Sequence, residues 1–162
     1  IRELTEEVDL VKAIDPSRKV IVTDSGEFGR WIPTASSGAD YFGSTMYRVV
    51  HNPKYGYFSY HLPPAFFRIK AGILNTFIRP KALYGVELQA EPWFATDVLQ
   101  TPIEQHYPLM NAVIFKDNVK YAESAGFERH YLWGTEWWYW MKEKNNDPSV
   151  WNAAVELFRA KN

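Results

Sequence analysis

A short polar cluster at the end of an apolar run carries the residues best suited to chemistry. Residues 82–86 form an apolar run of strand length, and Glu87, Gln89 and Glu91 follow it closely. A buried strand gains nothing from acids unless they are paired or take part in function. Because parallel sheets keep their chemistry at the carboxyl ends of their strands, this order predicts an α/β protein with a site at that end.

The elements that must position such a site alternate along the chain. Short apolar runs that end at turn signals predict strands near 19–24, 40–47, 82–88 and 129–134. Helical periodicity predicts helices between and around them, and the stretch 51–61, with its proline and glycine, is expected to be an irregular loop. Strands that alternate with helices form right-handed parallel βαβ units. We therefore expect residues 1–162 to form a single α/β domain.

Composition excludes several classes of function. The 162 residues carry 18 basic and 19 acidic side chains, so no electrostatic case exists for nucleic acid. Without cysteine, disulfides and thiolate metal sites are impossible, and no histidine pair has the spacing of a zinc site, so we expect no metal. No apolar stretch reaches ~18 residues, so no membrane span is expected. The cellular location stays open.

A nucleotide or other cofactor is not expected either. Residues 24–29, which follow the first predicted strand, lack the glycine-rich pattern and the Lys-Ser or Lys-Thr pair of a phosphate loop. An open-sheet protein for a small phosphorylated ligand therefore has little support from the residues.

Aromatic residues make up 17% of the chain, with 7 Trp, 10 Tyr and 10 Phe. Two interpretations remain open at this point. Aromatic side chains pack in cores, and they also form the platforms of sugar-binding clefts, because pyranose faces are apolar while their edges are polar.

The order of the strand ends points to a family. Asp24 ends the first strand, Gly43-Ser44 lies in the second, Glu87 ends the third and Trp133 ends the fourth. This order resembles the second half of the barrel in clan A glycoside hydrolases, such as cellulase-like and family 42 β-galactosidase-like enzymes. The resemblance implies a (βα)4 half of a TIM barrel. It also implies that Glu87 is the nucleophile of the seventh strand and that Trp133 closes the eighth strand under the sugar.

The acid/base residue of that family is missing from the chain. It stands in an Asn-Glu-Pro motif on the fourth strand, and the nearest match here is Glu91-Pro92. In an extended strand Glu87 and Glu91 would lie ~13 Å apart, at ~3.3 Å per residue. Retaining glycosidases need their carboxyl groups ~5–5.5 Å apart and inverting ones ~6.5–9.5 Å, so this is a poor catalytic pair.

A half-barrel needs a partner because its edge strands are unpaired. We expect either a homodimer or a complementary N-terminal half-barrel to close it. In such a dimer Glu136, just after Trp133, would lie near the position of the lost acid/base of the other copy. The first residue is Ile1 rather than Met, which is compatible with a fragment of a longer protein.

The remaining candidates form a predicted substrate-binding set around Glu87 and Glu136. They are polar and aromatic residues at or just after strand ends: Asp24, Glu27, Tyr47, His61, Gln89, Glu91, Trp133 and Trp137. For each, a structural role as a turn, cap or core residue is the alternative.

Two functions from different classes follow. The first is retaining glycoside hydrolysis in a completed barrel, with the chain inactive or weakly active alone. The alternative is a non-catalytic, self-associating structural or carbohydrate-binding module with an aromatic rim. The sequence leaves the sugar and the linkage undetermined.

Overall fold

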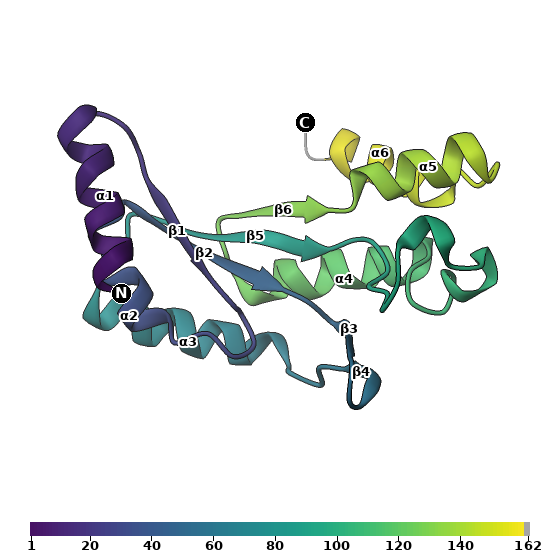
Figure 1. Cartoon of the computed structure of the whole chain (residues 1–162), viewed down its shortest axis with the longest axis horizontal. Coiled ribbons are helices and arrows are strands. Elements are labelled where there is room, and N and C mark those ends of the chain that lie inside the picture. Colours follow the sequence, from purple (N-terminus) through teal and green to yellow (C-terminus); the bar gives the residue numbers. More distant parts are fainter. Residues whose placement is uncertain (161–162) are drawn as a thin grey trace. The chain divides into compact units, whose positions relative to one another are not determined.

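The computed structural model describes residues 1–160 and divides the chain into two compact units. Unit 1 comprises Ile1–Met46, Leu62–Glu87 and Ala122–Tyr131, and unit 2 comprises Tyr47–His61, Leu88–Tyr121 and the residues from Leu132 onward. The elements, labelled in Figure 1, are α1 (Arg2–Ile14), β1 (Ile21–Asp24), α2 (Trp31–Ala35), β2 (Tyr41–Met46), β3 (Val49–Asn52), β4 (Gly56–Ser59), α3 (Pro64–Phe77), β5 (Leu83–Gln89), α4 (Ala112–Ala125), β6 (Arg129–Trp133), α5 (Thr135–Lys144) and α6 (Ser149–Ala160).

The predicted strands form a parallel sheet. Its order is β1-β2-β5-β6, and in the first pair Ile21 lies opposite Tyr41 and Asp24 opposite Ser44. The prediction of an α/β protein with four parallel strands is confirmed, and within residues 1–160 the sheet stays open rather than closing into a barrel. The strand order follows the chain order, without the reversal of a doubly wound sheet. Right-handed crossovers then place successive helices on the same face.

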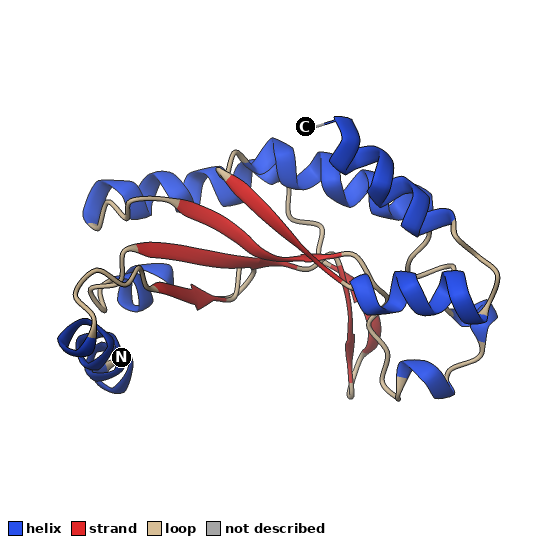
Figure 2. Ribbon diagram, turned by 90° about the horizontal axis from the view of Figure 1, so that it is seen from above, coloured by secondary structure: helices blue, strands red, loops and turns tan. Residues whose placement is uncertain are grey.

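An aromatic cluster forms the core of unit 1 on the helix-covered face of the sheet. Trp31 of α2 lies 5.2 Å from Phe42 of β2, 6.4 Å from Phe67 of α3 and 6.1 Å from Phe127, measured between ring centroids. Phe42 and Phe67 are fully buried. Burying one such side chain stabilises the fold by ~1.5–3 kcal/mol. Figure 2 shows α3 running along one side of the strands, where this cluster holds it.

The opposite face of the unit 1 strands is less covered. Tyr41, Tyr84 and Tyr131 form a row across neighbouring strands, with ring centroids 5.5 and 6.4 Å apart. Tyr131 is 51% exposed and Ile21, opposite Tyr41, is also exposed. The unit 1 strands therefore bury most of one face and leave an aromatic face partly open to solvent.

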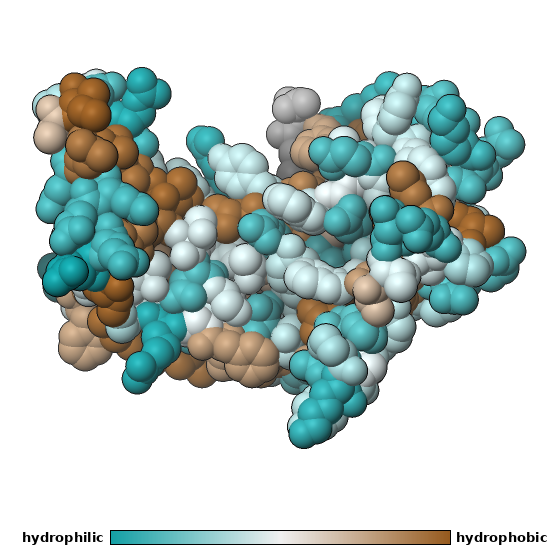
Figure 3. Space-filling view, viewed as in Figure 1, coloured by the Kyte–Doolittle hydropathy of each residue, from teal (hydrophilic) through white to brown (hydrophobic). Residues whose placement is uncertain are grey.

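Helix α1 carries an apolar stripe of Leu4, Val8, Leu10, Val11 and Ile14 and leaves most of it exposed. Val8 is the buried member of the stripe, whereas Leu10 and Ile14 are exposed. Hydrophobic residues gather on this helix in Figure 3. The Lys12 ammonium instead anchors the helix by an ion pair to Asp40.

The expected irregular loop over 51–61 is wrong, because most of it belongs to a β-hairpin in unit 2. Strands β3 and β4 pair antiparallel, with Val49 opposite Ser59. The side chain of Asn52 accepts the backbone N–H groups of Lys54 and Tyr55, and Gly56 has a φ of +73°. Proline and glycine in this stretch signal a turn between two short strands, which sequence reasoning took for a longer loop.

Candidate functional site

A pocket of about 280 Å³ in unit 2 gathers several of the residues singled out from the sequence. It is lined by Tyr47, Gln89, Glu91, Pro92, Trp93, Phe94 and Trp133. Trp93 and Trp133 expose 43% and 51% of their surface, which is unusual for the largest apolar side chain. Tyr47 meets Trp93 edge-to-face at 4.9 Å between ring centroids. The pocket is thus an aromatic surface that surrounds few polar groups.

Glu91 is the ionisable group of this pocket. The indole N–H of Trp133 donates a hydrogen bond to Glu91 Oε1 at 3.0 Å. Burial raises the pKa of the Glu91 carboxyl, the nearby Glu136 charge raises it further, and the Trp133 hydrogen bond opposes the shift. The ionised carboxylate accepts hydrogen bonds, and on protonation the group can also donate one.

Two hydrogen bonds hold the wall that carries Glu91. The N–H of Ala90 donates to the carbonyl of Trp133 at 2.9 Å, and the indole of Trp138 donates to the carbonyl of Ala90 at 2.7 Å. Gly134 adopts a φ of +133°, and a Cβ at this position would lie 2.6 Å from Glu91 Cβ. The close approach of these two segments therefore requires glycine at residue 134.

Gln89 lines the pocket, but its side-chain amide is engaged in structure. Its Oε1 accepts hydrogen bonds from the backbone N–H groups of Arg48 and Val49, both at 2.9 Å. Its Nε2 donates a hydrogen bond to the carbonyl of Val49 at 2.7 Å. The Gln89 amide therefore fixes the start of the β3–β4 hairpin, and with it the neighbouring Tyr47.

A second, mostly apolar pocket of about 250 Å³ shares Glu91 with the first. Glu136, Trp137 and Trp140 also line it. Trp137 is buried and donates its indole N–H to Nδ1 of His106 at 3.0 Å. Since an indole N–H only donates, the His106 ring carries its proton on Nε2 and donates to the carbonyl of Thr101 at 3.1 Å. Burial lowers the pKa of His106, which keeps this ring neutral.

Asp24 and Glu27 lie in unit 1, at the carboxyl end of β1, within a network of local hydrogen bonds. Asp24 accepts the backbone N–H of Ser25 and the hydroxyl of Thr34, both at 2.8 Å. Glu27 is buried and accepts the hydroxyl of Ser25 at 3.2 Å. These contacts shape the loop that leads into α2.

Lysine 70 stands over this loop. Its ammonium donates to the carbonyls of Gly26 and Gly29 at 2.7 and 3.1 Å and lies 4.3 Å from the ring centre of Trp31. Burial lowers the pKa of Lys70, and the charges of Asp24 and Glu27 oppose that shift. The group stabilises the fold locally.

Glu87 and His61 line neither of the two unit 2 pockets described above. Glu87 belongs to unit 1 and is half-buried. A Cβ on Gly85 would point at His130 and at Met46, so alternation along β5 places Glu87 on the same, helix-covered face as Gly85. His61 is exposed at the end of a unit 2 segment.

Sequence reasoning missed Trp93 and Phe94 as pocket residues. They follow Glu91-Pro92 directly, and this adjacency of a strand-end acid and two aromatic residues was the available signal. Within residues 1–160, no group of three histidine or acidic side chains is placed to hold a metal ion. Nor is any helix in that range long and apolar enough to cross a membrane.

Comparison of the chain with protein-family models, with curated proteins and with solved structures gives no match. The functional argument therefore depends on the geometry of the pocket itself.

Proposed function

We propose that unit 2 binds carbohydrate in the pocket formed by Tyr47, Trp93 and Trp133 around Glu91. The observation that carries this proposal is the pair of half-exposed tryptophans beside the partly buried Glu91 carboxyl, which is hydrogen-bonded to one of them. A pyranose ring has apolar C–H faces, which stack on aromatic rings, and a polar edge of hydroxyl groups.

Each residue has a defined part in this proposal. The exposed indole rings of Trp93 and Trp133 supply the apolar contact, and the Glu91 carboxyl hydrogen-bonds sugar hydroxyls. The hydrogen bond between Trp133 and Glu91 fixes both side chains before the ligand arrives, which lowers the entropy cost of binding.

Titration with gluco-, manno- and galacto-oligosaccharides, followed by tryptophan fluorescence, tests the proposal. Trp133→Ala is expected to abolish binding, whereas Tyr139→Ala, which removes an exposed aromatic ring on α5, is expected to leave it unchanged. Absence of any saturable signal with all three series at millimolar concentration would contradict the proposal.

A second candidate is the half-barrel of a retaining glycosidase, in which Glu87 would be the nucleophile; its place on the helix-covered face of the strands counts against that role. The observation in its favour is the strand order β1-β2-β5-β6, which is the order of successive strands in a TIM barrel. In this proposal two copies, or this chain and a complementary half, complete the barrel. Light scattering on the purified chain tests the homodimer, and a monomer at micromolar concentration would rule it out.

Turnover of nitrophenyl glycosides separates the two candidates. Loss of turnover in Glu87→Gln supports the half-barrel mechanism. If turnover is lost in Glu91→Gln or Glu136→Gln while Glu87→Gln stays active, the carboxyl groups of the second pocket carry out the hydrolysis instead. Binding without turnover leaves the carbohydrate-binding function alone.

A further inference from the structure

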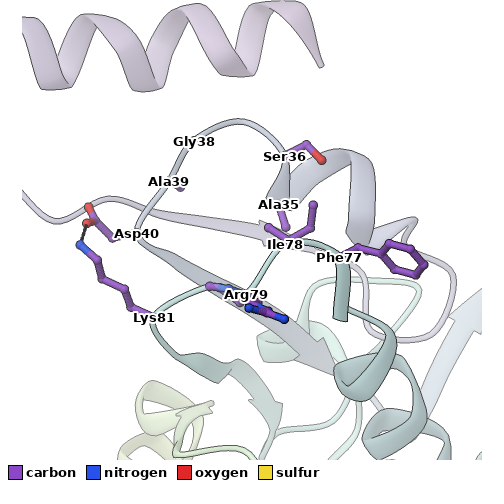
Figure 4. Close-up of a pocket in the computed structure, with 10 residues that line it drawn as sticks. Ala35, Ser36, Gly38, Ala39, Asp40, Phe77, Ile78, Arg79 and Lys81 are labelled. Atoms are coloured by element: carbon purple, nitrogen blue, oxygen red, sulfur yellow. Dashed lines mark hydrogen bonds and ion pairs between the residues drawn. The ribbon is translucent and has the colours of Figure 1, made fainter. Parts of the chain in front are cut away.

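A pocket of about 480 Å³ lies in unit 1, at the amino ends of β2 and β5. Residues 35–40, before β2, and residues 77–81, before β5, form its walls. Figure 4 shows Asp40 joined to Lys81 at one side, Phe77 at the other and Arg79 between them. All of these residues belong to unit 1, so the pocket is independent of the aromatic pocket of unit 2.

Positive charge exceeds negative charge around this pocket. The Asp40 carboxylate forms ion pairs with the ammonium groups of Lys12 at 2.5 Å, Lys81 at 2.6 Å and Lys19 at 3.7 Å. One carboxylate therefore meets three ammonium groups, and Arg79 adds a fourth cation on the pocket wall. The pKa of Asp40 is held well below its ordinary range, first by the Lys12 and Lys81 bonds, so its charge is already committed to the lysines.

Arg79 occupies a backbone position that suits glycine better. It follows the end of α3 with a φ of +56°, in the left-handed region, and its N–H donates to the carbonyl of Leu74. Helices commonly end in this way with glycine or asparagine, and a larger residue here adds strain. The guanidinium has no carboxylate at ion-pair distance within residues 1–160. The exposed Arg79 guanidinium is therefore accessible to an anionic ligand.

We propose that this pocket binds the phosphate group of a small phosphomonoester. The dianion sits between Arg79 and Lys81, where a guanidinium fork and an ammonium both donate charge-assisted hydrogen bonds. The pocket is larger than a bare phosphate needs, and the organic part of the ligand lies against Ala39 and Phe77. A neighbouring hollow also borders Arg79 and contains Glu128, which has no ion pair within residues 1–160, whereas the Asp40 charge is balanced by its three lysines, so the ligand lies on the Asp40 side.

Titration with phenyl phosphate, followed by backbone amide NMR signals at fixed ionic strength, tests this site. Saturable shifts are expected at Gly38, Ala39 and Lys81, with weaker binding of inorganic phosphate and none of phenol. Arg79→Asn is expected to weaken phenyl phosphate binding about tenfold, the loss of one charged hydrogen bond. Asparagine tolerates the left-handed backbone, so this variant should fold. The matched control is Arg159→Ala, an exposed arginine on α6.

Three results would overturn the proposal. The first is the absence of saturable shifts in residues 36–40 and 78–81. The second is unchanged affinity in Arg79→Asn, and the third is binding of benzoate as tight as that of phenyl phosphate. Asp40→Asn gives an independent check. Phenyl phosphate should bind more tightly to this variant, because the Asp40 carboxylate no longer competes for Lys81.

Discussion

The two compact units use most of their aromatic residues differently, although Trp31 of unit 1 also donates its indole N–H to the carbonyl of Ser25 at 3.0 Å. In unit 1 Trp31, Phe42, Phe67 and Phe127 pack against one another on one face of the sheet, and the main polar cluster, around Asp40, lies at the amino edge. In unit 2 each of three tryptophans donates its indole N–H to one defined acceptor: Glu91, His106 or Ala90. Apolar packing stabilises a core, whereas directed indole hydrogen bonds also fix the positions of side chains around a pocket.

The largest expected effect is the loss of core packing in unit 1. Phe67→Ala removes a fully buried ring from the aromatic cluster and is expected to lower the free energy of unfolding by ~3–5 kcal/mol. Urea unfolding followed by circular dichroism measures it. Phe77→Ala, on the same helix, removes a ring that is 70% exposed and should cost far less. Similar losses in both variants would contradict the role of the cluster.

In unit 2 the corresponding test removes a hydrogen bond and keeps the ring. Trp138→Phe leaves the buried carbonyl of Ala90 without its indole donor and is expected to cost ~1–3 kcal/mol in unfolding free energy. Trp151→Phe on α6 is the control, since the Trp151 indole lies at a less buried position. If both substitutions cost the same, packing rather than directed hydrogen bonding stabilises unit 2.

The buried His106 makes stability depend on pH. Its folded-state pKa is lowered, so the stabilisation by the neutral ring is complete above the unfolded-state pKa of about 6.5 and is lost as pH falls. Urea midpoints measured from pH 7.5 to pH 5 should fall in the wild type. His61→Asn, at an exposed position, should keep the same slope, and His106→Asn should flatten it. An unchanged slope in His106→Asn would refute the assignment.

The smallest expected effect on stability concerns Glu91, where pH should act in the opposite direction. Its pKa is raised in the fold, so the stability it contributes is present below about pH 4.5, the ordinary carboxyl pKa, and is lost as pH rises. Glu91→Gln should therefore be slightly more stable than the wild type at pH 7, because its amide oxygen still accepts a hydrogen bond from Trp133.

If Glu91 binds sugar as the protonated acid, wild-type affinity should also fall as pH rises, while Glu91→Gln affinity stays constant. Glu143→Gln, an exposed carboxyl of α5, is the control for both measurements.

Much of the secondary structure could be predicted from local patterns. The apolar runs near 19–24, 40–47, 82–88 and 129–134 lie between turn signals and correspond to β1, β2, β5 and β6. The β3–β4 hairpin was missed because its strands are only four residues long and are half-buried or exposed, so no apolar alternation marks them.

The candidate site was predicted only as separate residues. Strand-end positions selected Tyr47, Gln89, Glu91 and Trp133 individually, and the structure places all four around one pocket. That grouping depends on contacts between segments more than 40 residues apart, such as Trp133 with Glu91. Spacing along the chain carries no information about such contacts.

The sequence by itself determined the α/β class, the parallel strands and the types of side chain available for chemistry. These features follow from backbone periodicity and turn preferences, which act over a few neighbouring residues. Only the tertiary structure decided that Glu87 lies on the helix-covered face, that Gln89 fixes a hairpin and that Glu91 lies among tryptophans. Burial and pKa depend on which distant segments approach each other, and at Gly134 that approach needs a residue without a side chain.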